Sequence, residues 1–135
     1  MNISRSIPFI YIAILASSFF CSCTNSPQKT MNSNIKFAKK DIDFDQITYN
    51  IPKEYTLKYS NNGEETIKIL EIETTCECTA FKWDKQPIDP GEVGSILIIY
   101  SPKYPGHFKE FVRVFTNSSK DNVIQLTIKG RVVES

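Results

Sequence analysis

The chain has 135 residues, which is the length of one domain rather than of several. It carries 16 Lys and Arg against 15 Asp and Glu, and the first 22 residues hold one charged residue, Arg5. The remainder is neutral, which argues against nucleic acid as a partner because phosphate binding needs a clustered positive surface. Apolar residues at 41% and charged residues at 23% exclude a disordered chain and an integral membrane bundle.

The first 22 residues predict a lipoprotein signal peptide. Arg5 precedes a short apolar run over residues 7–20, which is the pattern of a secretory signal. Cys23 follows the small residue Ser22, and this order resembles a bacterial lipoprotein processing site, where lipid is attached to the Cys and the signal is removed. The alternatives are an ordinary cleaved signal with an incidental Cys23 and, less favoured, an uncleaved transmembrane anchor. Residues 23–34 are polar and predict a flexible tether behind the lipid.

From this N-terminus we expect a membrane-anchored protein of the bacterial cell envelope. More than one acyl chain on Cys23 makes such anchoring stable. No acidic residue precedes Asp41, whereas some envelope lipoproteins reach the cell surface through an acidic signal just after the lipidated Cys. The sequence therefore favours the membrane face that looks into the periplasm.

Residues 35–135 predict one all-β domain, an antiparallel β-sandwich. Pro residues interrupt any long helix, and apolar residues do not recur at helical spacing. Residues 54–60 and 123–132 alternate between apolar and polar side chains, as strands with one buried and one solvated face do.

Three further strands are predicted between these two. Residues 94–100 are apolar on both faces and indicate an interior strand, and residues 108–116 form another. The alternation changes within 66–74, which predicts a β-bulge or burial on both faces. Short strands at this spacing are typical of a sandwich or a barrel. The predicted turns lie at 61–63, 89–91, 105–106 and 117–122.

Several short motifs occur in an order that resembles one bacterial family. They are Phe44–Ile47, Asn61–Gly63, Thr75–Thr79, Ile88–Glu92, Pro105–Phe108, Thr116–Asn117 and Ile128–Val132. Over residues 41–133 the chain resembles the bacterial envelope lipoprotein family catalogued as domain of unknown function 1573. The resemblance implies an immunoglobulin-like fold and an envelope location. It implies no activity, substrate or cofactor, and Glu77 stands where the family usually has Gly between two cysteines.

Cys76 and Cys78 are the candidate site residues of the domain. After export they meet an oxidising compartment, in which unpaired thiols rarely persist. Residues two apart in a strand have Cα atoms about 6.6 Å apart, close to the disulfide limit of roughly 6.8 Å, so a bridge needs a bent backbone. Three states stay open: two buried thiols, a labile intramolecular disulfide, or a thiolate site for a soft ion such as Cu(I), with His107 as the one available imidazole.

No pattern in the sequence predicts a catalytic residue or a bound cofactor, and no metal motif of recognised spacing occurs. His107 is the single His, follows a turn and has no orienting carboxylate signalled in the sequence. We therefore expect a non-catalytic protein-interaction or structural module, anchored by its lipid and bound to a protein partner through sheet edges or loops. The alternative function is a periplasmic thiol site at Cys76 and Cys78 for redox or soft-metal handling.

Overall fold

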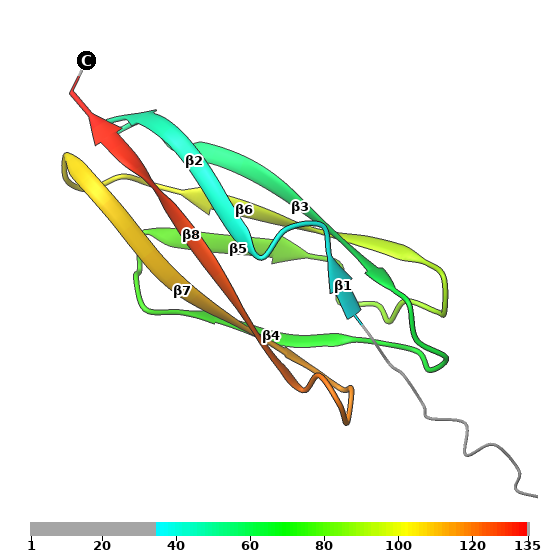
Figure 1. The fold of residues 1–135 in the computed structure, drawn as a ribbon. Helices are drawn as coiled ribbons and strands as arrows, with labels where there is room; N and C mark the ends of the chain where they lie inside the picture. The colour runs from blue at the N-terminus through cyan, green and yellow to red at the C-terminus, as the bar shows by residue number, and fades with distance from the viewer. Residues whose placement is uncertain (1–34, 135) are drawn as a thin grey trace, which may run out of the picture.

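The computed structural model describes residues 35–134, which form eight strands in two stacked sheets (Figure 1). The predicted signal peptide over residues 1–22, the lipidation site Cys23 and the tether over 23–34 lie outside the described residues. Within residues 35–134 no helix has the length and apolarity needed to cross a membrane. The strands are β1 (Ile35–Phe37), β2 (Asp41–Thr48), β3 (Lys53–Asn61), β4 (Ile69–Thr74), β5 (Thr79–Trp83), β6 (Val93–Tyr100), β7 (Gly106–Thr116) and β8 (Val123–Val133).

The two sheets confirm the predicted all-β sandwich. One sheet has the strand order β1-β3-β6-β5, and the other has the order β2-β8-β7-β4. All pairs are antiparallel except β2 and β8, which run parallel. The antiparallel expectation therefore has one exception. β2 and β8 lie at opposite ends of the domain sequence, so no hairpin turn between them imposes an antiparallel direction.

All five strands predicted from the sequence are present, and two finer expectations are confirmed. β6 is interior, between β3 and β5, as its two apolar faces indicated. The register of β4 on β7 shifts between Ile69 and Glu71, which is the irregularity that the changed alternation predicted. The bulge turns Leu70 outward, and its side chain is exposed.

The core lies between the two sheets and consists of inward side chains from alternate positions. Phe44 of β2 joins the layers, because its ring contacts Tyr55 of β3 at 5.9 Å and Tyr100 of β6 at 6.1 Å between centroids. The fully buried side chains include those of Ile42, Val112, Val114 and Ile128.

The strand pairings give the sandwich two distinct ends. Ile35 of β1 pairs with Asn61, the last residue of β3, and the neighbouring Ser60 pairs with Val93, the first residue of β6. We call this the β1 end. The other end lies at Tyr100, the last residue of β6, which pairs with the first residue of β5. The two ends are at opposite extremes of the long axis in Figure 1.

The turn at the β1 end is organised by a buried amide. Asn61 is fully buried, and its Nδ2 donates hydrogen bonds to the carbonyl oxygens of Glu65 at 2.7 Å and Ile88 at 3.1 Å. Its Oδ1 accepts a hydrogen bond from the backbone N–H of Gly63 at 3.0 Å. The predicted turn at 61–63 is thus fixed by the side chain of its first residue, which satisfies backbone groups that would otherwise lose their hydrogen bonds.

Candidate functional site

Cys76 and Cys78 lie where the chain crosses from one sheet to the other. β4 ends at Thr74 in one sheet and β5 begins at Thr79 in the other, so the pair lies in a short crossover at the end of the sandwich opposite β1. The crossover is bent, and it brings the two Cα atoms to 5.2 Å, within the range for a disulfide. The structure holds the two cysteines in an intramolecular disulfide.

The two cysteines of this disulfide differ in their exposure to solvent. Cys78 is buried, with 6% of its surface exposed, whereas Cys76 is half-buried. The backbone N–H of Cys78 donates a hydrogen bond to Cys76 Sγ at 3.2 Å, and the Cys78 carbonyl accepts one from the backbone N–H of Ser101 at 2.8 Å. The backbone of Cys78 is therefore held by hydrogen bonds on both sides, and Cys76 is the more exposed cysteine of the two.

A buried carboxyl, Glu110, contacts the buried sulfur. Glu110 lies on β7 with 7% of its surface exposed. Its Oε1 lies 3.0 Å from Cys78 Sγ, and its Oε2 accepts a hydrogen bond from Thr79 Oγ1 at 2.8 Å. Glu110 was not among the residues predicted from the sequence, although the sequence pattern marks it. Glu110 occupies an inward position of β7, between Phe108 and Val112, where an apolar side chain would be expected.

Burial raises the pKa of Glu110 above its ordinary value, and hydrogen bonds from Thr79 and Thr74 oppose this rise in part. Burial, with the charge of Glu110 as a smaller cause, also raises the pKa of Tyr100. A disulfide sulfur carries no proton. A hydrogen bond at the 3.0 Å contact between Glu110 and Cys78 therefore requires that the carboxyl hold the proton and donate it to sulfur.

A pocket of about 420 Å³ opens beside the disulfide and is lined by both cysteines and Glu110. His107 also lines it, together with Lys103 and Lys109. The predicted position of His107 just after a turn is confirmed, since it is the exposed second residue of β7. The aromatic lining is Tyr100, Tyr104 and Phe108, of which Tyr100 and Phe108 are stacked with ring centroids 4.0 Å apart.

The chemistry open to this cluster depends on its redox state. The sulfur atoms of the two cysteines and a Glu110 oxygen lie within 4.8 Å of one another. In the disulfide the sulfur atoms are bonded to each other, so they offer no thiolate to a soft ion. The oxidised cluster is instead suited to reaction with a thiol, since it combines a reachable sulfur, a buried sulfur and an adjacent acid.

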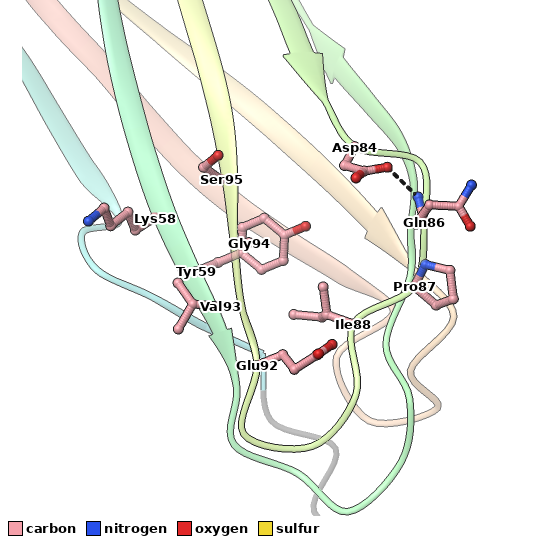
Figure 2. Close-up of a pocket in the computed structure, with 10 residues that line it drawn as sticks. All are labelled: Lys58, Tyr59, Asp84, Gln86, Pro87, Ile88, Glu92, Val93, Gly94 and Ser95. Carbon is pink, nitrogen blue, oxygen red and sulfur yellow. Dashed lines mark hydrogen bonds between the residues drawn. The ribbon is translucent and has the colours of Figure 1, made fainter.

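A second pocket, of about 510 Å³, lies at the β1 end (Figure 2). β5 pairs with residues 96–100 of β6, and this pairing ends where Trp83 lies opposite Ile96. Residues 93–95 of β6 therefore pair with β3 on one side only, and the pocket lies on their other side. Figure 2 shows the Tyr59 ring beside Gly94, with Asp84 and Gln86 across the opening. This arrangement leaves a short stretch of strand edge open next to a hollow.

The side chains around this open edge are fixed by their neighbours. A Cβ atom at Gly94 would lie 2.3 Å from the Tyr59 ring, so the ring occupies the space that a side chain would need. Burial raises the pKa of the Tyr59 hydroxyl, and the charge of Asp84 raises it further. The Asp84 carboxylate is itself oriented by the backbone N–H of Gln86, which donates to its Oδ1 at 2.8 Å.

Comparison with known proteins supports the sandwich and extends it to a family. A family model described as protein of unknown function (DUF1573) matches residues 35–132. No curated protein matches the sequence.

Solved structures resemble the chain at low sequence identity. A protein of unknown function from Porphyromonas gingivalis W83 has a TM-score of 0.65 at 13% identity, over 72% of this chain and 46% of that one, so this chain spans less than half of that protein. The ASH/PapD-like domain 7 of human CEP192 has a TM-score of 0.64 at 13% identity, over 100% of this chain and 98% of that one. The secreted serine protease VesC from Vibrio cholerae has a TM-score of 0.57 at 10% identity, over 75% of this chain and 23% of that one. These likenesses show the fold alone, an immunoglobulin-like sandwich.

Proposed function

We propose that this chain, which belongs to the DUF1573 family of proteins of unknown function, is a lipid-anchored module of the bacterial envelope that binds a protein partner. In this proposal the domain works by binding and not as an enzyme, it needs no cofactor, and nucleic acid is not its partner. The lipid on Cys23 holds it at the membrane, on the periplasmic side.

The open edge of β6 is the observation that carries the binding proposal. An exposed strand edge presents backbone N–H and C=O groups that an extended segment of another protein can pair with. Residues 93–95 of β6 lack a strand neighbour on the pocket side among the described residues. The pocket of about 510 Å³ beside them offers room for side chains of the incoming segment, against the Ile88 side chain and the Tyr59 ring.

Exposure at this edge supports binding there. Val93 is an apolar residue with 65% of its surface exposed, and it lines the pocket. An incoming strand would cover it and remove apolar surface from water, which favours association. The flanking charges are mixed, since Lys58 lies on one side and Asp84 and Glu92 lie on the other. We therefore expect a partner segment that is apolar at its centre and carries charges at its ends.

Site-specific photo-crosslinking in intact cells tests the edge. A photoreactive residue at Val93 or at Gln86 should give the same covalent adduct, of one mass. Phe111 is the matched control, because it is also an exposed apolar residue, at 46%, but lies on β7 of the other sheet. Adducts from Phe111 alone, or no adduct at Val93 and Gln86, would contradict binding at the open edge.

The lipid anchor is tested by substitution at the processing site. Cys23→Ala should move the protein from the membrane fraction to the soluble fraction of the cell, and the N-terminal peptide should lose the mass of its acyl chains. Cys21→Ala is the matched control, since it removes a neighbouring Cys and should leave the protein in the membrane. Retention of the Cys23→Ala protein at unchanged mass would contradict the anchor.

A further inference from the structure

We infer that the Cys76–Cys78 disulfide undergoes exchange with anionic thiols that enter the pocket beside it, with Cys76 as the attacked sulfur and Glu110 as the proton donor to Cys78. This activity goes beyond the proposed binding function and lies at the other end of the sandwich. It rests on the unequal access to the two sulfur atoms, on the buried carboxyl and on the charges of the pocket.

Access decides which sulfur is attacked. Thiol–disulfide exchange requires a thiolate to reach one sulfur of the bridge, so the rate depends on exposure of that sulfur. Cys76 is half-buried, whereas Cys78 has 6% of its surface exposed and is covered by Glu110 and the crossover backbone. The incoming thiolate therefore attacks Cys76, and Cys78 is the leaving group.

Glu110 supplies the proton that neutralises the leaving sulfur of Cys78. A thiolate formed at Cys78 would be a buried charge, which is costly unless it is neutralised. The Glu110 Oε1 atom lies 3.0 Å from that sulfur, within reach for proton transfer. Burial favours the protonated carboxyl, and Thr79 Oγ1 holds the other carboxyl oxygen at 2.8 Å. Burial therefore favours the proton on Glu110, and the 3.0 Å contact orients the carboxyl toward the bond that breaks.

The exchange balances in two steps. A thiolate attacks Cys76 Sγ, the Cys76–Cys78 bond breaks, and a mixed disulfide forms on Cys76. The electron pair of the broken bond goes to Cys78 Sγ, which takes the proton from Glu110. A second thiolate attacks the external sulfur of the mixed disulfide, releases Cys76 as a thiolate that is protonated by water, and leaves as a disulfide. Two thiols are oxidised and one protein disulfide is reduced by two electrons; in the reverse direction the Glu110 carboxylate accepts the Cys78 proton.

The pocket charges select the thiol. Besides the two cysteines, the ionisable groups that line it around Glu110 are Tyr100 from β6, Lys103 and Tyr104 from the loop that follows, and His107 and Lys109 from β7. Lys103 is exposed, and its positive charge attracts an anionic thiol and stabilises its thiolate form. The Lys109 ammonium lies over the Phe111 ring, 5.6 Å from the ring centre. We therefore expect thiols that carry a carboxylate or sulfonate to react faster than neutral or cationic ones.

Three small thiols of different charge test this selection on the oxidised full chain, purified in detergent. The probes are 2-mercaptoethanesulfonate, 2-mercaptoethanol and cysteamine, compared at equal thiolate concentration. Acid quenching, alkylation and mass spectrometry of the tryptic peptide 69–82 report the redox state of Cys76 and Cys78 alone. The sulfonate should react at least about 10-fold faster than cysteamine at low salt, and the difference should shrink at high salt. Equal rates, or a faster cation, would overturn the selection.

The roles of the two sulfur atoms and of the acid have separate readouts. Fragmentation of the mixed-disulfide peptide should place the probe on Cys76, and a probe on Cys78 would overturn the assignment. Glu110→Gln should slow the exchange at least about 10-fold at pH values below the pKa of Glu110, while Glu77→Gln, at the exposed residue between the cysteines, should not slow it. Equal slowing of both variants, or of neither, would overturn the role of Glu110.

The pH profile of the unmodified protein keeps the proposal testable if Glu110→Gln fails to fold. The rate per thiolate should fall as the pH rises through the pKa of Glu110, because the proton donor is lost. A rate per thiolate that is independent of pH would overturn the role of the acid. A bridge that reacts only after the protein unfolds would overturn the exchange itself.

Discussion

At the scale of single residues, Glu110 is the most unusual side chain of the described domain. It is a carboxyl among inward apolar residues of β7, and its partners are a sulfur atom and the hydroxyls of Thr79 and Thr74. The raised pKa of Glu110 has a direct consequence for stability. The folded state holds this proton more tightly than the unfolded state does, so the contribution is fully present below the ordinary pKa of about 4.5 and is lost as the pH rises through the folded value.

Glu110→Gln should therefore flatten the pH dependence of folding. The oxidised wild-type domain should lose up to about 1.4 kcal/mol of unfolding free energy per pH unit over the interval in which only the folded state keeps the proton. The glutamine variant has no titrating group at position 110 and should be as stable as the wild type or more so at pH 8. Urea unfolding between pH 4 and pH 8 measures this, with exposed Glu77→Gln as control. If the unfolding free energy of the glutamine variant depended on pH as steeply as that of the wild type, Glu110 would not be the source of the pH dependence.

The site could be predicted in part from the sequence. Cys76, Cys78 and His107 were singled out by residue type, and the structure brings all three to one pocket. Glu110 and Tyr100 were missed, because each lies in a strand far along the chain from the cysteines and joins them only through the packing of the two sheets. The redox state of the pair was also left open, since it depends on the bend of the crossover, which residue spacing does not determine.

At the scale of the strands, the apolar pattern of the sequence identified β3, β6, β7 and β8, which have eight or more residues, and β4 in spite of its bulge. It missed the other three strands. β1 has three residues and β5 has five, too few for the alternation to stand out. β2 is longer, but its pairing shifts between Asp43 and Gln46, and Asp45 has a positive φ of 56°. A bulge of this kind changes which face the next side chains occupy, and the period of two is broken.

β6 owes its register on β3 partly to one glycine. Gly94 pairs with Tyr59, whose ring fills the space above it. Gly94→Ala should destabilise the domain by about 1–3 kcal/mol, because the added methyl displaces the ring and overpacks the site. Thermal or urea unfolding measures this.

Two comparisons isolate the cause of that loss. Ser95→Ala changes the adjacent, less constrained residue and should cost much less. In the Tyr59→Leu background the ring is gone, so Gly94→Ala should cost less than it does in the wild type, which a double-mutant cycle detects. If Gly94→Ala cost the same unfolding free energy in the wild type and in the Tyr59→Leu variant, the Tyr59 ring would not be the cause of the destabilisation.

At the scale of the whole molecule, the sandwich has a continuous core that does not depend on its disulfide. The bridge closes a loop of only three residues, from Cys76 to Cys78. Chain-entropy arguments assign such a loop on the order of 1.6 kcal/mol of stabilisation, much less than a long loop would give. The core residues come instead from both sheets and most strands.

The domain over residues 35–134 should therefore fold alone and remain folded when reduced. We expect a β-type far-ultraviolet circular dichroism spectrum and a single cooperative thermal transition in both redox states. Reduction should lower the unfolding free energy by on the order of 1.6 kcal/mol without changing the spectrum. Loss of the β-type spectrum on reduction, or a helical spectrum in either state, would contradict this.

The opposite ends of the sandwich also lie at different distances from any anchor that precedes Ile35. That residue begins at the β1 end, next to the open edge of β6, whereas the disulfide lies beyond the far end of the same strand. β6 extends about 23 Å from Val93 to Tyr100, and this length separates the two sites. A domain tethered through β1 would keep the strand edge near the bilayer and hold the disulfide outermost. Proteins close to the membrane would then reach the strand edge first, and thiols that diffuse through the compartment would reach the disulfide. The two sites would therefore bind their partners from different sides, and neither would block access to the other.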